Sequence, residues 1–229
     1  MIAEKLQDVE KNIEAAKARR RADLTDDVTL IAVTKNHDVA AMREAIDAGA
    51  TQVGENRVQE AQGKYETLDR KVTWHLIGHL QTNKAKHAVK MFDLIHSVDS
   101  EHLARAIDKE AAKLGKVQDI LVQVNLAHEE QKSGVEEAAL RPLLDICDAL
   151  PNVRVLGLMF IAPDYEDREQ CRPLFRRMHE IFLAAKDIPW KTSNIKYLSM
   201  GMSHDYEIAI EEGANIVRVG TAIFGPRQY

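Results

Sequence analysis

The chain has 229 residues, of which 45% are hydrophobic and 29% are charged, and its formal net charge is −5 at pH 7. This balance is ordinary for a globular protein, and no apolar run approaches the roughly 20 residues that a membrane-spanning helix needs. The negative net charge also argues against a general nucleic-acid binder. We therefore expect neither a membrane nor a nucleic-acid partner.

The N-terminal segment mixes acidic and basic residues and has no apolar core of the kind that signal peptides carry. We expect it to form an ordinary helix over residues 2–21, and we expect the protein to be cytoplasmic. Cys147 and Cys171 are predicted to be reduced and partly buried, without a disulfide or a metal site. The length fits one domain that covers residues 1–229.

Short apolar runs alternate with helix-period segments along the chain, which is typical of parallel βα units. Eight strands close a (β/α)8 TIM barrel, and we favour this fold over a doubly wound open sheet. The sequence has no strand-Gly-x-Gly-x-x-Gly-helix turn, and polar residues follow nearly every predicted strand. The predicted strands cover residues 28–34, 52–54, 73–77, 94–97, 120–125, 153–160, 195–200 and 216–220, and the predicted helices cover 2–21, 39–48, 57–68, 102–114, 136–150, 167–185 and 206–212.

Lys35 directly follows the most strand-like run, residues 28–34. In a βα barrel the carboxyl ends of the strands form the active face, so this lysine is predicted to lie there. A primary amine in a desolvated pocket is less strongly protonated and can form a Schiff base with an aldehyde. A lysine at a strand end is more commonly a solvated capping residue. The covalent role is favoured by residues later in the chain, at the seventh and eighth strands.

The last two strands are each followed by a segment that contains glycine, Ser199-Met-Gly-Met-Ser203 and Val219-Gly-Thr221. The loops after strands seven and eight commonly hold a phosphate in βα barrels. Glycine lets backbone N–H groups turn toward an anion, and the serine hydroxyls and the Met202 amide could add donors. Either segment alone is more simply a cap or a tight turn, but together they favour an anion site.

Arg218 lies two residues before Gly220 and is predicted to point into the barrel mouth. Its guanidinium could donate to a ring nitrogen or pair with a carboxylate, and the alternative is a buried salt bridge. An aldehyde-reactive lysine, a phosphate site and an arginine between them match the ends of one ligand, pyridoxal 5′-phosphate (PLP).

Several segments spread over the whole chain carry a family resemblance. They are residues 32–35 (AVTK), 54–60 (GENRVQE), 74–81 (WHLIGHLQ), 96–99 (HSVD), 122–125 (VQVN), 132–134 (KSG), 157–159 (GLM), 199–203 (SMGMS) and 218–225 (RVGTAIFG). In these segments the chain resembles the YggS/PROSC family of pyridoxal phosphate homeostasis proteins. The resemblance implies a barrel like the N-terminal domain of alanine racemase, the fold type III of PLP proteins.

The resemblance also implies the residues that contact PLP. It places the cofactor on Lys35 as a Schiff base and the pyridine nitrogen opposite Arg218. The other implied contacts are Ser199, Ser203, Gly220 and Thr221 at the phosphate, with Met202 beside them, and Asn56 and His79 near the ring.

The guanidinium of Arg218 only donates hydrogen bonds, so it would face an unprotonated pyridine nitrogen and disfavour the carbanion that PLP enzymes stabilise. Two-base racemisation tolerates such a nitrogen, but it needs a second acid or base, which in alanine racemase comes from a separate C-terminal domain. We therefore predict a monomeric, non-catalytic carrier or buffer of PLP in vitamin B6 homeostasis, with apo forms of PLP enzymes as recipients. One alternative is a single-domain amino-acid racemase that uses Tyr197 or Tyr206 as its second acid or base. Another is a barrel that binds a phosphorylated sugar or nucleotide without a covalent step.

Overall fold

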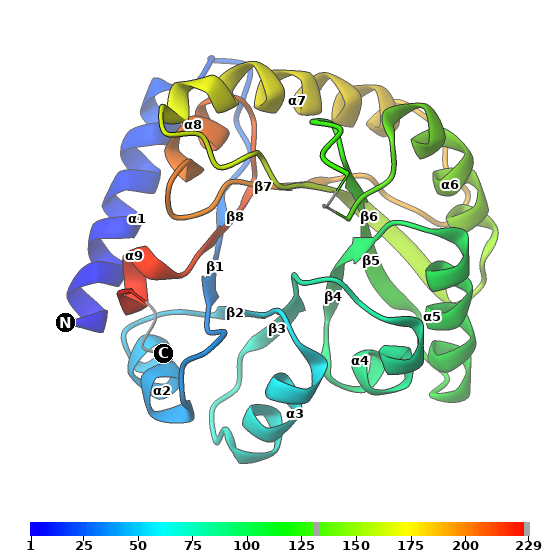
Figure 1. Ribbon diagram of the computed structural model, residues 1–229, viewed down its shortest axis with the longest axis horizontal. Helices are drawn as coiled ribbons and strands as arrows, with labels where there is room; N and C mark the ends of the chain where they lie inside the picture. Colours follow the sequence, from blue (N-terminus) through cyan, green and yellow to red (C-terminus); the bar gives the residue numbers. More distant parts are fainter. Residues whose placement is uncertain (131–132, 227–229) are drawn as a thin grey trace.

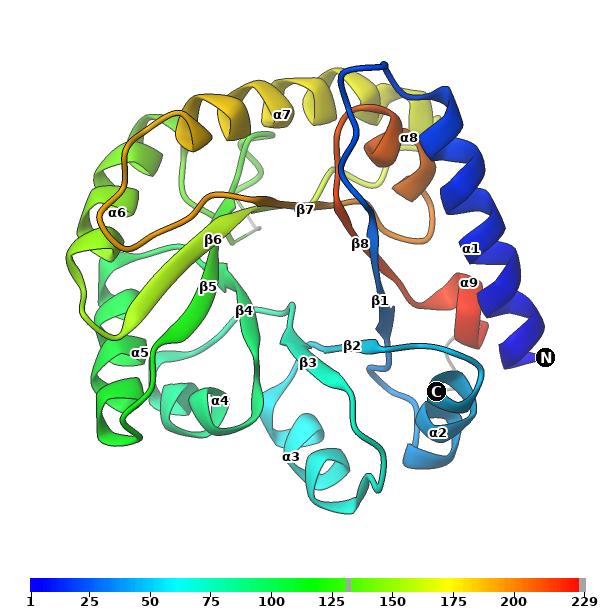
Figure 2. The same cartoon turned by 180° about the vertical axis from the view of Figure 1, so that it is seen from behind.

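The computed structural model describes residues 1–130 and 133–226, so Lys132 of the 132–134 segment lies outside the described residues. In the described part of the chain, eight parallel strands close into a barrel in the order β1 to β8. The helices form a ring around it, as Figures 1 and 2 show from opposite sides. This closed sheet confirms the predicted TIM barrel and rules out the doubly wound open sheet.

All eight predicted strands are present, and their ends differ from the prediction by at most two residues. The strands are β1 (Thr29–Val33), β2 (Gln52–Glu55), β3 (Thr73–Leu76), β4 (Leu94–Val98), β5 (Gln118–Val124), β6 (Val153–Phe160), β7 (Tyr197–Met200) and β8 (Ile216–Val219).

The seven predicted helices are also present, although the start of the predicted 167–185 helix is a separate 3-10 turn, η2. A further 3-10 turn and two short helices, α4 and α9, were not predicted because a few residues cannot display a helical period. The helical elements are α1 (Ile2–Arg19), α2 (Val39–Asp47), α3 (Val58–Thr67), η1 (Thr82–Lys84), α4 (Ala85–Met91), α5 (Glu101–Lys113), α6 (Glu137–Ala149), η2 (Arg168–Cys171), α7 (Arg172–Lys186), α8 (Tyr206–Glu211) and α9 (Thr221–Phe224).

The apolar core has two layers, which follow from the alternation of side chains along each strand. In β1, Ile31 and Val33 belong to the cluster inside the barrel, whereas Ala32 belongs to the cluster between the barrel and the helices. The inner cluster comprises Ile31, Val33, Ile77, Leu94, Leu121, Leu156, Met159 and Ile216. The space inside the barrel is therefore partly apolar, and several of the polar side chains described below, such as Arg218 and Ser199, lie in it.

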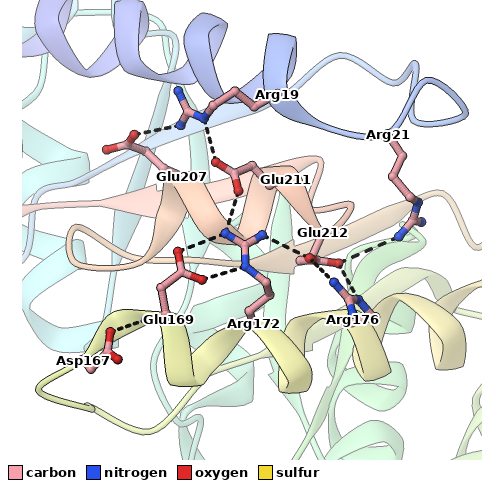
Figure 3. Close-up of polar contacts among 9 residues, drawn as sticks. All are labelled: Arg19, Arg21, Asp167, Glu169, Arg172, Arg176, Glu207, Glu211 and Glu212. Atoms are coloured by element: carbon pink, nitrogen blue, oxygen red, sulfur yellow. Dashed lines mark hydrogen bonds and ion pairs between the residues drawn. The ribbon is translucent and has the colours of Figure 1, made fainter.

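A network of arginines and glutamates joins α1, α7 and α8 (Figure 3). Arg172 donates to Glu169, Glu211 and Glu212, and the carboxylate of Glu212 is 95% buried. Arg19 of α1 donates to Glu211 as well, at 2.8 Å. In the chain, α8 lies between β7 and β8, and therefore between the two glycine-containing segments. The network attaches this helix to α1 and α7.

Cys147 and Cys171 are both unbridged, as predicted, and both are fully buried rather than partly buried. Burial raises the pKa of the Cys147 thiol to about 12, so this thiol stays protonated at neutral pH. Within residues 1–130 and 133–226, no helix has the length and apolar character needed to cross a bilayer.

Candidate functional site

Lys35 lies half-buried directly after β1, at the carboxyl end of the barrel. Side chains from the second βα unit fix the backbone on both sides of it. The ammonium of Lys64 donates to the carbonyl oxygen of Thr34 at 2.8 Å, and a carboxylate oxygen of Glu60 accepts from the amide of Asn36 at 2.5 Å. The residues before and after Lys35 are thus held by one lysine and one glutamate.

These two side chains belong to a buried charge cluster with Glu55. The ammonium of Lys64 lies 2.8 Å from Glu55 Oε1 and 2.7 Å from Glu60 Oε1, and the hydroxyl of Thr34 donates to Glu55 Oε1 at 2.6 Å. The side chain of Glu55 is fully buried, and this burial raises its pKa, against the opposing effect of Lys64. The cluster therefore ties the loop that carries Lys35 to α3 on both sides of the lysine.

Arg218 is the third residue of β8, and its side chain lies inside the barrel, 3% exposed. Its guanidinium donates to Ser199 Oγ at 2.6 Å and to the carbonyl oxygen of Phe160 at 3.0 Å. Burial lowers its pKa to about 10, with Asp205 acting in the opposite direction. Arg218 therefore remains a cation at neutral pH, and its hydrogen-bond acceptors are neutral groups rather than the carboxylate of a salt bridge.

Ser199 lies on β7 and is fully buried beside Arg218. Its hydroxyl also lies 3.0 Å from Nδ1 of His96. This serine is therefore part of the barrel interior, below the loop that begins at Gly201.

The loops after β7 and β8 are joined through Ser203. Its hydroxyl oxygen accepts from the amides of Gly220 at 3.1 Å and Ala222 at 3.3 Å. Two acceptor bonds use both lone pairs of the oxygen, so the hydrogen of the hydroxyl remains available as a donor. Thr221, at the start of α9, is exposed at the same place. The side chain of Met202 is exposed, but its amide already donates to Asp205 Oδ1 at 2.7 Å.

Two glycines allow these loops to approach the rest of the site. Gly201 has a φ of 103°, and a Cβ added there would lie 2.7 Å from Cβ of Ala209. A Cβ at Gly220 would lie 3.3 Å from Cβ of Val33, two residues before Lys35. The strands β1 and β8 are neighbours in the barrel, so Lys35 and the β8 loop lie at adjacent strand ends.

Asn56 and His79 follow β2 and β3, and their loops are pressed together. A Cβ at Gly78 would lie 2.3 Å from the carbonyl oxygen of Asn56, so only glycine fits between the two loops. The imidazole of His79 is exposed, and its Nδ1 lies 3.2 Å from the hydroxyl of Ser133 in the loop after β5. Every site residue predicted from the sequence thus lies at or just beyond the carboxyl half of a strand.

The similarity to known proteins covers nearly the whole chain. The model of the alanine racemase N-terminal domain family matches residues 5–228. The pyridoxal phosphate homeostasis protein of Aquifex aeolicus is 47% identical over 203 residues, which cover 87% of each chain. The protein of the same name from Escherichia coli K12 is 38% identical over 234 residues, covering 100% of this chain and 97% of that one. This chain belongs to the pyridoxal phosphate homeostasis protein family.

A solved structure extends the likeness to three dimensions. PipY from Synechococcus elongatus PCC7942, with PLP bound, is 40% identical and superposes with a TM-score of 0.85, covering 98% of this chain and 100% of that one. The family resemblance and the barrel of the alanine racemase type that the sequence predicted are both confirmed.

In this member of the homeostasis family, the hydroxyl of one tyrosine considered for a racemase bonds to α1, and the other tyrosine begins a strand. The hydroxyl of Tyr206 accepts from the amide of Asn12 on α1, at 3.2 Å. Tyr197 is the first residue of β7, at the amino end of the barrel. Neither ring is therefore placed to act as an acid or base beside Lys35.

Five polar residues take part in the hydrogen-bond networks that hold Lys35 and Arg218, but the sequence assigned none of them a contact: Gln52, Glu55, Lys64, His75 and His96. His75 and His96 lie within motifs that carried the family resemblance, and both are polar residues inside predicted strands. A polar residue inside a predicted strand can indicate a side chain in the barrel interior, because a strand places every second side chain there. The sequence does not reveal their partners, which come from strands and helices elsewhere in the chain.

Proposed function

We propose that this protein binds PLP at the carboxyl face of its barrel, through a Schiff base on Lys35, and stores or delivers it without catalysing a reaction. The observation that carries the proposal is the meeting of three unlike groups at the ends of neighbouring strands. A lysine amine follows β1, a buried guanidinium lies on β8, and a hydroxyl with an available hydrogen joins the loops after β7 and β8. PLP carries an aldehyde, a pyridine nitrogen and a phosphate, which are the partners of these groups.

The phosphate is assigned to the loops after β7 and β8. Ser203 would donate its hydroxyl hydrogen, and Thr221 would offer its hydroxyl and amide from the exposed start of α9. Gly220 has no side chain to obstruct the approach. Ser199 would act beneath these loops by holding Arg218, and Met202 would border the phosphate with its exposed side chain. Asn56 and His79 would border the ring.

Arg218 argues against most PLP catalysis, and a racemase would need in addition a second acid or base on the far face of the substrate. A protonated guanidinium donates to the pyridine nitrogen and keeps it unprotonated, so the ring withdraws electrons weakly. The relatives are named as homeostasis proteins rather than as enzymes, which supports the same conclusion. We further propose that the protein acts as a monomer in the cytoplasm and that apo forms of PLP enzymes accept its cofactor.

The test is an absorption spectrum of the protein loaded with PLP, for the wild type, Lys35→Ala and the control Lys90→Ala, before and after borohydride reduction. We expect a visible band in the wild type and the control that is lost in Lys35→Ala, and reduction should fix the cofactor on Lys35. A protein that takes up no PLP would refute the proposal. Binding that survives Lys35→Ala without a visible band would favour a non-covalent phosphate binder.

A second assay separates the carrier from the racemase. The loaded protein is incubated with L-alanine in deuterated water, and deuterium at the α-carbon is followed by NMR. The carrier predicts no exchange above that of PLP alone. Steady exchange with turnover would favour the racemase.

A further inference from the structure

A continuous chain of hydrogen-bonding side chains crosses the interior of the barrel. Gln52 Oε1 lies 2.6 Å from His75 Nε2, and His75 Nδ1 lies 2.9 Å from His96 Nε2. His96 Nδ1 lies 3.0 Å from Ser199 Oγ, which accepts from Arg218 at 2.6 Å. The five residues come from β2, β3, β4, β7 and β8, and Gln52 is the first residue of its strand, at the amino end of the barrel. The chain therefore joins the candidate site to the opposite end of the molecule.

Both ends of this chain indicate the same direction for its hydrogens, because Arg218 can only donate and the side-chain oxygen of Gln52 can only accept. Arg218 cannot accept, so Ser199 accepts from it, and the hydrogen of the Ser199 hydroxyl is directed to Nδ1 of His96, the other partner of this hydroxyl among the described residues. A neutral His96 then carries its hydrogen on Nε2 and donates it to Nδ1 of His75. His75 in turn donates from Nε2 to the side-chain oxygen of Gln52. Each donor meets one acceptor, and both imidazoles are the Nε2–H tautomer.

Burial keeps both imidazoles neutral. The side chain of His96 is fully buried and His75 is 4% exposed. Desolvation lowers the pKa of His75 to about 4 and that of His96 well below its ordinary value, and the charges of His75 and Arg218 act on His96 in the same direction. A proton on Nδ1 of His96 would point at Ser199 and place a second cation beside Arg218. A neutral ring therefore leaves Nδ1 of His96 available to accept from the hydroxyl of Ser199.

We propose that Gln52, His75 and His96 are positioning residues that fix the guanidinium of Arg218 by orienting the hydroxyl of Ser199. Ser199 has one hydrogen, and as long as His96 accepts it, the oxygen presents its lone pairs to Arg218. The carbonyl oxygen of Phe160 holds the other end of the guanidinium at 3.0 Å. The orientation of the chain is a property of the protein alone, whereas its effect on PLP rests on the proposed function.

The orientation is tested on the wild-type protein without PLP, by two-bond ¹H–¹⁵N NMR with ¹⁵N-labelled histidine at pH 7. His75→Leu and His96→Leu spectra serve only to assign the two signals. We expect both residues to show the pattern of the neutral Nε2–H tautomer. An imidazolium, or a hydrogen on Nδ1 of either ring, would overturn the proposal. This result does not depend on whether PLP binds.

The effect on Arg218 is tested with PLP labelled with ¹⁵N in the ring. In His96→Leu the hydroxyl of Ser199 loses its acceptor, so we expect the pyridine nitrogen shift to move and the affinity for PLP to fall about tenfold, the size of one hydrogen bond to a charged group. His96→Gln keeps one donor and one acceptor and should lose less. The control His87→Leu, on α4, should match the wild type. An unchanged nitrogen shift and affinity in a folded His96→Leu would refute the positioning role, whereas a wild type that binds no PLP would refute the proposed function instead.

Discussion

Replacing Lys64 by methionine tests the buried charge cluster that holds Lys35. Methionine has a similar length but cannot bond to Glu55, Glu60 or the carbonyl oxygen of Thr34. Breaking a buried pair by removing one partner costs about 3–5 kcal/mol, because the remaining charge has no compensation. The side chain of Glu55 is fully buried and that of Lys64 is 9% exposed, so we expect the full range to apply.

A loss of this size is large for a domain with roughly 5–15 kcal/mol of stability in total. For a chain of this length, about 4 kcal/mol corresponds to a fall in Tm of roughly 8–16 °C. Urea unfolding followed by circular dichroism measures the free energy directly. The control is Lys113→Met, which removes an exposed pair with Glu110 and should cost about 0–1 kcal/mol.

The pH dependence of this stability loss tests whether the unpaired charge of Glu55 causes it. Burial raises the pKa of Glu55, and without Lys64 we expect it to rise further. A carboxyl whose folded pKa lies above its unfolded value loses stability as the pH rises through the folded pKa. The deficit of Lys64→Met should therefore shrink when the pH is lowered from 7 toward 5. A variant within 1 kcal/mol of the wild type at pH 7, or a deficit independent of pH, would refute this reasoning.

Four further predictions follow from individual contacts. Gly201→Ala should lower the free energy of unfolding by about 1–3 kcal/mol, because φ is positive there and the new Cβ would clash with Ala209. The control Gly63→Ala in α3, where an added Cβ would have no atom within 4 Å, should be neutral or stabilising in the same urea titration. Ser203→Ala should weaken PLP binding about tenfold in a fluorescence titration, since it removes one donor to the phosphate and the link between two loops; unchanged affinity would place the phosphate elsewhere. The pKa of His75 is about 4 in the folded protein and about 6.5 in the unfolded chain, so between these values the unfolded chain binds one more proton. The free energy of unfolding should therefore fall as the pH drops below about 6.5, by up to ~1.4 kcal/mol per pH unit for each buried histidine. A free energy of unfolding that stays constant from pH 7 to 5 would contradict this. Glu212→Gln should lower the free energy of unfolding by about 2 kcal/mol, because the Glu212 carboxylate lies 3.1 Å from Arg172 and 2.9 Å from Arg176. The control Glu14→Gln, in an exposed pair with Lys17, should change it by less than about 0.5 kcal/mol.

Local sequence patterns were enough to predict the barrel and the outline of the site. Alternating apolar runs and helical periods are local signals, and they located all eight strands within two residues. Polar residues at strand ends are equally local, and for that reason Lys35 and Arg218 could be singled out before their surroundings were known. Short elements such as α4 and α9 escaped because they span too few residues to show a period.

The contacts between polar groups, in contrast, depend on how the barrel closes. His96 and Ser199 are 103 residues apart and lie on strands that are not neighbours in the barrel, yet they share a hydrogen bond across its interior. Lys64 reaches back 30 residues from α3 to the carbonyl oxygen beside Lys35. Alternation along a strand tells which side chains point inward, but the register and tilt of the closed sheet decide which of them lie at the same height. Lys35 and Arg218 could therefore be predicted from the sequence, whereas the side chains that hold them in place could not.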